Sequence, residues 1–289
     1  MIEQTTDVAT ASPLLRLVRP KQWVKNALVA APLVFSGSFL HAEAVERALL
    51  AILLFTVASC AVYVLNDLID AESDRCHPVK LLTRPIASGA VSVAQARLLL
   101  GALWTVVAGS AFYDPRLAGA LVLYILLNVA YSVRLKHVPV VDLFILASGF
   151  VLRVYGGAVA IRVHLSFWMF ITTLCLALYL ACGKRRQELV KSGAKSRAVL
   201  REYTAPLLDS YSSISEISAI VFYGLFVSTT RPELAITMPF VLFGLFRYRY
   251  LVEVRSEGEN PTEVLWSDIP LMLCVLFWAA TSVYVLLPR

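Results

Sequence analysis

A cluster of carboxylates at the end of a long apolar run is the strongest chemical signal in this sequence. It has the form Asn-Asp-x-x-Asp-x-x-x-Asp and begins at Asn66. If the run continues as a helix, Asp67, Asp70 and Asp74 fall within an arc of roughly 60° on one face. Each charge would cost about 2.5–3.5 kcal/mol at mid-membrane, whereas a divalent cation at the membrane edge removes most of that cost. We therefore predict a magnesium site facing a phosphorylated substrate; the alternative is a solvated acidic loop.

Two cationic segments could meet such a substrate. The loop from Arg75 to Gly89 mixes cations, Lys80 and Arg84 among them, with turn residues. Such a loop can fold over an anion as a lid. A second segment runs from Tyr131 through Lys136 towards Asp142, at the start of a later apolar run.

Asp142 and Arg153 share one face of that later run with Gly149 and Gly156, if the run is helical. Glycines on such a face permit close helix packing. A guanidinium three turns into a membrane helix is expensive when it has no partner. Arg153 therefore either faces a polar cavity or has a structural partner, such as Asp142 or a backbone carbonyl.

The next apolar run ends in Gly183-Lys184-Arg185-Arg186-Gln187-Glu188, and further basic residues follow. Most of these cations are explained by the excess of Lys and Arg in cytoplasmic loops of membrane proteins. Lys184 and Glu188 lie four residues apart on one face at the membrane edge. They form either a simple surface pair or a phosphate-binding cation with a metal-bridging carboxylate, and the spacing leaves both readings open.

The composition indicates the elements that must position these residues. Hydrophobic residues make up 58% of the 289 and charged residues 16%, and the mean hydropathy is +0.72. These values predict an all-α polytopic membrane protein. Nine apolar segments are long enough to span a bilayer, and the short Tyr113–Arg116 segment between the third and fourth predicts a tight turn at Pro115. The segments are 24–40, 46–66, 94–112, 115–132, 139–161, 165–182, 211–229, 232–250 and 266–287.

The distribution of basic residues predicts the orientation of these spans. With a cytoplasmic N-terminus, about four times as many Lys and Arg residues fall in cytoplasmic segments as outside. The C-terminus is then outside the cell membrane and the acidic motif is cytoplasmic. The net charge of +6 reflects this topology, and no pattern for nucleic-acid binding appears. We expect residues 1–15 to form a flexible cytoplasmic tail and residues 16–289 a single transmembrane catalytic domain.

The motifs quoted so far resemble those of the UbiA superfamily of intramembrane transferases. The acidic run from Asn66 to Asp74 is similar to the first signature of that superfamily, on its second helix. The segments Arg19–Asn26, Arg84–Gly89 and Leu135–His137 are similar to further motifs of these enzymes. The resemblance covers the whole membrane part and implies a UbiA-like helical bundle with a cytoplasm-facing active-site cavity.

One departure indicates a branch within the superfamily. Aromatic prenyltransferases of this family carry a second aspartate-rich motif after the sixth span, where this chain has the basic sequence 183–188. That replacement resembles the phosphoribosyltransferase branch, whose members act on decaprenyl phosphate. Phosphoribosyl diphosphate carries three phosphate groups, and its 5-phosphate needs protein cations such as Lys184 and Arg185, which a second pair of aspartates would repel.

The resemblance implies a magnesium-dependent pentosyl transfer from phosphoribosyl diphosphate to a polyprenyl phosphate in the membrane. The products would be polyprenyl-phosphoryl-β-D-ribose 5-phosphate, a precursor for arabinan-type cell-wall synthesis, and diphosphate. Asn66, Asp67 and Asp70 would be catalytic, and with Asp74 they would hold Mg²⁺. The implied substrate-binding residues are Lys25, Lys80, Arg84, Tyr131, Lys136, Asp142, Arg153, Lys184, Arg185 and Glu188.

Two other functions fit parts of the sequence. A UbiA-type aromatic prenyltransferase of a quinone or haem pathway shares the first acidic motif but should carry acid in place of Lys184 and Arg185. A membrane transporter could also contain buried charge, but the charges here collect at one membrane face and no inverted repeat is visible. Association of the chain with copies of itself is left open.

Overall fold

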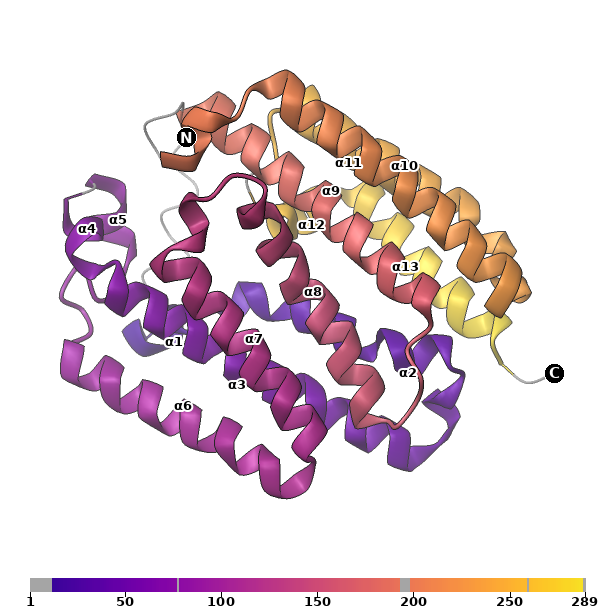
Figure 1. The fold of residues 1–289 in the computed structure, drawn as a ribbon, viewed down its shortest axis with the longest axis horizontal. Coiled ribbons are helices and arrows are strands. Elements are labelled where there is room, and N and C mark those ends of the chain that lie inside the picture. Colours follow the sequence, from indigo (N-terminus) through magenta and orange to yellow (C-terminus); the bar gives the residue numbers. More distant parts are fainter. Residues whose placement is uncertain (1–11, 77, 193–197, 259, 288–289) are drawn as a thin grey trace.

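The computed structural model describes residues 12–76, 78–192, 198–258 and 260–287, and these are helices joined by short connections, with no strand among them. The all-α prediction is therefore confirmed. The long helices α3, α6 and α7 lie together on one side of the bundle, α9, α10, α11 and α13 lie on the other, and α8 runs between the two groups (Figure 1).

Among the described residues, seven helical segments are long and apolar enough to cross a membrane. They are α3 (Ala42–Ile69), α6 (Val93–Tyr113), α7 (Pro115–Val133), α8 (Val141–Ala160), α9 (Phe167–Ser192), α10 (Ala205–Thr230) and the η6–α11 pair (Pro232–Thr237 and Met238–Glu253). An eighth candidate is the pair α12 (Pro261–Ser267) and α13 (Ile269–Val285), which meet at 95°. The protein is thus an integral membrane protein.

The segment predicted as the first span, 24–40, does not form one long helix in the structure. It is divided among η1 (Pro20–Ala30), α2 (Ala31–Phe35) and η2 (Ser38–Leu40). Pro32 lies at the start of α2, where proline is tolerated but cannot donate a helical hydrogen bond. The segment packs against α3 and α8 despite this break.

Capping residues define the ends of several long helices. Asp114 caps α7 by accepting from the backbone amides of Arg116 and Leu117, and Pro115 occupies the first helical position. The predicted tight turn between α6 and α7 is therefore confirmed. Ser92 and Gln95 form a reciprocal capping box at the start of α6.

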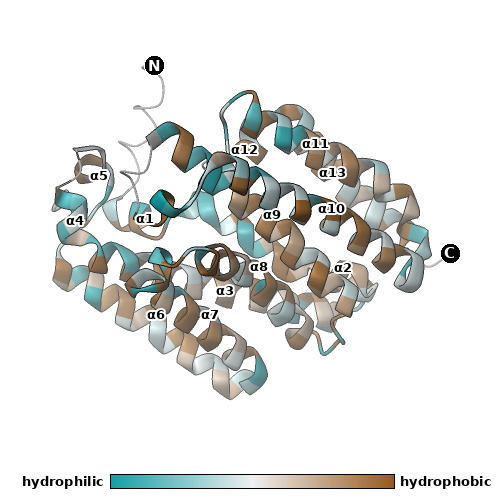
Figure 2. Cartoon of the chain, turned by 45° about the horizontal axis from the view of Figure 1, so that its top comes forward, coloured by the Kyte–Doolittle hydropathy of each residue, from teal (hydrophilic) through white to brown (hydrophobic). Residues whose placement is uncertain are grey.

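One end of the bundle collects the polar connections between the long helices, and we call it the polar end. It comprises η3 (Leu135–His137), η5 (Ala198–Glu202), α12 and the short helices α1 (Pro13–Leu17), α4 (Ala71–Arg75) and α5 (Pro78–Thr83). Hydrophilic residues gather towards the helices α1, α4 and α12, whereas the long helices are largely hydrophobic (Figure 2). The last residues of the predicted tail lie in α1, and residues 1–11 are outside the described residues.

Close backbone contact holds η1 against α8. A Cβ atom added to Gly157 would lie 1.9 Å from the carbonyl oxygen of Val29, so only glycine fits there. At Gly156 the added atom would lie 2.3 Å from the ring of Phe55 on α3. The prediction that glycines on this span permit close packing is therefore confirmed at Gly156. The result is a fixed position for η1, which carries Lys25 and Asn26.

Candidate active site

The acidic motif lies at the polar end, where α3 gives way to α4. The prediction of one continuous helical face needs correction, because α3 ends at Ile69 and Asp70 separates it from α4. Helical backbone bonds nevertheless bridge the break, from the Asp70 amide to Asn66 and from the Asp74 amide to Asp70. Asp67 and Asp74 are both buried, while 39% of the Asp70 side chain is exposed. The carboxylates therefore have different surroundings.

Asp67 has two arginine partners on one of its oxygens. Its Oδ1 accepts from Arg19 and from Nη1 of Arg84, the latter at 2.6 Å. Its Oδ2 is buried and has no hydrogen-bond partner among the described residues. A buried carboxylate oxygen without a partner is costly unless a cation or donor meets it. Arg84 comes from the predicted lid loop, so that loop does contact the acidic motif.

The acidic motif is joined to the neighbouring helix α7 and to η3. Asn66 Oδ1 accepts from the Ser132 hydroxyl at 2.5 Å, and Asp70 accepts from Lys136 Nζ at 3.2 Å. Lys136 thus lies beside a predicted metal ligand. The side chain of Lys80, also predicted to bind substrate, lies outside the described residues.

Arg185 forms the centre of a second, buried group. Its guanidinium donates to Asp142 at 2.7 Å, to Glu188 at 2.5 Å and to the Tyr131 hydroxyl at 2.6 Å. The Arg185 side chain is fully buried. Charge-assisted bonds of this kind are short and strong, and they fix the orientation of the guanidinium. Arg185 is therefore placed to hold its neighbours, and its nitrogens are already engaged.

Asp142 has a further partner that the sequence did not indicate. Its Oδ1 accepts from the hydroxyl of Tyr203, which itself accepts from the backbone amide of Val140. Burial, together with the hydrogen bond to Asp142, raises the pKa of the Tyr203 phenol, so it remains a donor at neutral pH. The suggested pairing of Asp142 with Arg153 is not formed, because Asp142 binds Arg185 instead.

Lys184 lies next to this group at the end of α9. Its Nζ is 3.9 Å from Glu188 Oε1, while the shorter contact of Glu188 is with Arg185. Lys184 and Glu188 therefore form a long ion pair, one of the two alternatives that the spacing left open, and 32% of the Lys184 side chain is exposed. A cation in this position can turn towards an anion at the polar end.

Lys25 on η1 lies between the acidic motif and α9. The positive charges of Lys184, Arg153 and Arg19 all act on it, and Glu263 is the acid that opposes them. Within the part of the chain that the structure describes, Lys25 forms no ion pair. A group of cations with few acids among them favours binding of an anion such as phosphate.

Arg153 is buried in a network of neutral groups. It donates to Asn26 Oδ1 at 2.7 Å, to the Gly149 carbonyl at 2.7 Å and to the hydroxyls of Ser59 and Tyr124 at 3.1 and 3.0 Å. The sequence left open a polar cavity or a structural partner for Arg153. The structure provides a backbone carbonyl, as one of those alternatives suggested, together with three neutral side chains.

The acidic motif and the Arg185 group meet through α7. Ser132 binds Asn66, and the preceding residue, Tyr131, binds Arg185. Sequence reasoning did not assign roles to Arg19, Ser132 or Tyr203, which complete these contacts. Arg19 could have been found, since it precedes a proline at the start of a basic segment. Ser132 and Tyr203 carry no signal of this kind.

An apolar cavity of about 390 Å³ lies among η1 and helices α8 to α13. Phe150, Leu176, Tyr223, Tyr248 and Trp278 are among its lining residues. None of the predicted site residues lines it. This chamber is therefore distinct from the polar residues described above, and its lining suits a hydrocarbon chain.

The residues of the acidic motif fit a magnesium ion in their chemistry. They supply carboxylate and amide oxygens, which are the ligands that Mg²⁺ prefers, and the partnerless Oδ2 of Asp67 is a ready donor. Over the described ranges, no three His, Cys, Asp or Glu residues converge as a complete metal site. Arg19 and Arg84 neutralise Asp67 in this arrangement.

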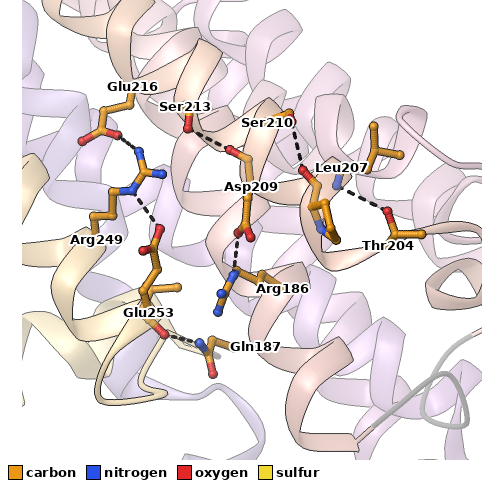
Figure 3. A network of polar contacts seen from close by, with 12 residues as sticks. Arg186, Gln187, Thr204, Leu207, Asp209, Ser210, Ser213, Glu216, Arg249 and Glu253 are labelled. Atoms are coloured by element: carbon orange, nitrogen blue, oxygen red, sulfur yellow. Dashed lines mark hydrogen bonds and ion pairs between the residues drawn. The ribbon is translucent and has the colours of Figure 1, made fainter.

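A further polar cluster, which we call the α9–α11 cluster, joins α9, α10 and α11 (Figure 3). Arg186 binds Asp209 at 2.5 Å, and Arg249 binds both Glu216 and Glu253 at 2.8 Å. Gln187 donates to the carbonyl of Val252. In this cluster both arginines have carboxylate partners, so it offers no excess of positive charge.

Comparisons with known proteins give consistent results. Residues 27–268 match the model of the UbiA prenyltransferase family. The chain is 34% identical to a decaprenyl-phosphate phosphoribosyltransferase of Mycobacterium tuberculosis, covering 95% of this chain and 96% of that protein. It is 35% identical to the enzyme of that name from Mycolicibacterium smegmatis, covering 93% and 91%.

The fold is similar to that of a solved UbiA homolog from Archaeoglobus fulgidus, whose structure was determined with GPP and Mg²⁺ bound. The TM-score is 0.75, with 21% identity, and the match covers 95% of this chain and 99% of the other. At this identity the likeness concerns the fold alone.

Proposed function

This chain belongs to the UbiA prenyltransferase family, and we propose that it transfers the 5-phosphoribosyl group of phosphoribosyl diphosphate to a polyprenyl phosphate. The observation that carries the proposal is the cation group at the polar end, where Lys25 and Lys184 lie close to the buried Arg185 group. Phosphoribosyltransferases of the same name match nearly the whole chain.

The charge of the donor substrate explains this arrangement. Phosphoribosyl diphosphate has a phosphate at one end and a diphosphate at the other, each carrying negative charge near neutral pH. The 5-phosphate would contact Lys184 and Lys25, whose charges lie near enough to act on each other. Arg185 would fix Glu188 and Asp142 beside them without contacting the substrate itself.

The diphosphate end would lie at the acidic motif, with Asn66, Asp67, Asp70 and Asp74 holding Mg²⁺. When bound, magnesium supplies stabilisation of the charge that develops on the leaving diphosphate. Arg19 and Arg84 already lie against Asp67, so they can move from Asp67 to the diphosphate oxygens. Lys136, next to Asp70, can then meet the phosphate of the lipid.

The reaction needs no general base from the chain. An oxygen of the lipid phosphate, already ionised near neutral pH, would form a bond to the anomeric carbon while the bond from that carbon to diphosphate breaks. Inversion of the α-linked donor gives polyprenyl-phosphoryl-β-D-ribose 5-phosphate and diphosphate. The residues at the polar end contribute by positioning both phosphates and by stabilising the departing charge.

The lipid would lie with its phosphate at the polar end and the nearest isoprene units in the apolar cavity of about 390 Å³. The membrane orientation follows the distribution of basic residues, with the N-terminus and the polar end in the cytoplasm and the C-terminus outside. Two further spans would bring the total to nine. One is the interrupted segment 24–40, and the other is the bent α12–α13 pair.

Product formation tests the proposal directly. Purified protein is incubated with radiolabelled phosphoribosyl diphosphate, Mg²⁺ and a short polyprenyl phosphate, and the organic phase is counted. Label in the organic phase is the expected result, and its absence contradicts the proposal. In the parallel reaction, a prenyl diphosphate and 4-hydroxybenzoate should give no prenylated aromatic product; substantial formation of that product would favour an aromatic prenyltransferase.

A further inference from the structure

Arg153 is a buried cation without a carboxylate partner among the described residues. The residue is 4% exposed, and its guanidinium is bound by Asn26, Ser59, Tyr124 and the Gly149 carbonyl, all of them neutral. It also lies over the ring of Tyr124, 4.8 Å from the centroid. These contacts satisfy its hydrogen bonds but leave its charge uncompensated.

An uncompensated buried charge is costly to maintain. Hydrogen bonds alone could be met by a neutral polar side chain at lower cost. Two features of arginine remain that such a residue would lack: a rigid fork that can reach several helices at once, and a permanent positive charge. The fork acts at η1, where Asn26 accepts from Arg153. The charge of Arg153 repels the ammonium of the adjacent Lys25, so the link to Lys25 is one of position.

The link between Arg153 and η1 is part of a closely packed contact. One turn after Arg153, Gly157 meets the carbonyl of Val29 without room for a side chain. Asn26 is fully buried and also donates to Thr56 of α3 at 3.0 Å. The position of Lys25 is therefore determined by α8 from one side and α3 from the other.

We propose that Arg153 is a positioning residue for Lys25: through Asn26 it holds η1 so that the Lys25 ammonium faces Lys184 and the 5-phosphate of the donor. This inference rests on the proposed function. It also revises the expectation that Arg153 itself binds substrate, because its donors are already engaged inside the bundle.

A double-mutant cycle tests the link between the two residues. Arg153→Gln should raise the KM for phosphoribosyl diphosphate about 10-fold, with little change in the KM for polyprenyl phosphate. Lys25→Met should raise the same constant by at least as much. If Arg153 acts through Lys25, the double variant should be no worse than Lys25→Met alone. Arg153→Lys, which keeps the charge but not the fork, should recover part of the loss.

Arg231 provides a matched control for general loosening of the first segment. It donates to the carbonyls of Phe35 and Ser36 at 2.9 and 2.7 Å, and so ties down the opposite end of the segment that Arg153 holds. Arg231→Gln should leave the KM for phosphoribosyl diphosphate unchanged. An equal rise of this KM in Arg231→Gln would overturn the positioning role. It would also be overturned if the effects of Arg153→Gln and Lys25→Met on this KM multiply in the double variant.

Two further outcomes keep the test decisive. If Arg153→Gln does not fold, Asn26→Ala breaks the same link and takes its place in the cycle, with the same expected non-additivity. If the unaltered protein forms no lipid product from phosphoribosyl diphosphate, the proposed function fails, and the positioning role fails with it. If the unaltered protein is active but the two substitutions have multiplicative effects on KM, the positioning role alone is contradicted.

Discussion

Two polar clusters of the molecule distribute their charges in opposite ways. At the acidic motif, one carboxylate, Asp67, is shared by two arginines, Arg19 and Arg84. In the α9–α11 cluster, one arginine, Arg249, is shared by two carboxylates, Glu216 and Glu253. The local charge is therefore positive around Asp67 and negative around Arg249.

Two consecutive residues of α9 belong to different groups: Arg185 to the buried group that meets the acidic motif through α7, and Arg186 to the α9–α11 cluster. Arg185 is fully buried between Asp142, Glu188 and Tyr131, whereas Arg186 is 20% exposed and pairs with Asp209 (Figure 3). Successive positions on a helix differ by about 100° in direction, so neighbours in sequence face different partners. A basic run in a sequence can therefore contain a site residue next to a purely structural one.

The largest effect is expected at the shared carboxylate. Asp67→Ala should lower kcat/KM by about a thousandfold or more, because it removes both the partner of two arginines and a predicted magnesium ligand. EDTA should have the same effect on the unaltered protein. Product formation from labelled phosphoribosyl diphosphate measures both. Full activity in EDTA, or in a folded Asp67→Ala protein, would remove the basis for treating this cluster as the metal site.

Arg185→Ala should have the next largest effect, and it should appear in stability as well as in activity. The change leaves Asp142 and Glu188 buried without their cation, which typically costs about 3–5 kcal/mol. Thermal unfolding in detergent, with and without phosphoribosyl diphosphate, measures this loss. If the variant were as stable as the unaltered protein, the Arg185 group would not be the organising centre that its contacts indicate.

Lys184→Ala should act on one substrate and spare the fold. Loss of one charge-assisted contact of roughly 1.5–3 kcal/mol should raise the KM for phosphoribosyl diphosphate by about 10–100-fold. The KM for the polyprenyl phosphate should change far less, and steady-state kinetics with each substrate varied separate the two. A rise in the KM for the polyprenyl phosphate alone would instead indicate that Lys184 binds the lipid. If neither KM changes, Lys184 is only the surface partner of Glu188.

Arg186→Ala should have the smallest effect and is the matched control for Arg185 and Lys184. Both side chains of the Arg186–Asp209 pair are partly exposed, and pairs of this kind contribute about 0.2–1 kcal/mol to the free energy of unfolding. Both Michaelis constants should remain as in the unaltered protein, with a slight fall in melting temperature. A tenfold change in either constant would mean that the α9–α11 cluster also takes part in the reaction.

Much of the fold could be predicted from the sequence because hydropathy reports directly on membrane helices. The segments around α3, α6, α7, α8, α9, α10 and η6–α11 were all predicted, with most boundaries within about six residues. The exception is α9, which was predicted to end at 182 and continues to Ser192. The division of 24–40 into three short helices and the 95° bend before α13 were not. Hydropathy averages over a window, and so it does not register a break in direction.

The chemistry of the candidate site was less predictable in its pairings than in its residue types. The acidic motif, Lys136, Lys184 and the Arg185 region are predicted as site residues from spacing and from resemblance to known enzymes. Contacts such as Tyr203 to Asp142, 61 positions apart, or Ser132 to Asn66, 66 apart, depend on helix packing. Neither Ser132, at the end of an apolar run, nor Tyr203, in a polar connection, belongs to a motif that would distinguish it from other serines and tyrosines.

The network around Arg153 also has a consequence for how the protein is assembled. Its members come from η1, α3, α7 and α8, and Arg153 is 127 positions from its partner Asn26. Asn26 is therefore translated long before Arg153. Until α8 packs against η1, the Asn26 side chain lacks its guanidinium donor and Arg153 lacks one of its acceptors. The network is therefore complete only when η1, α3, α7 and α8 have all packed together.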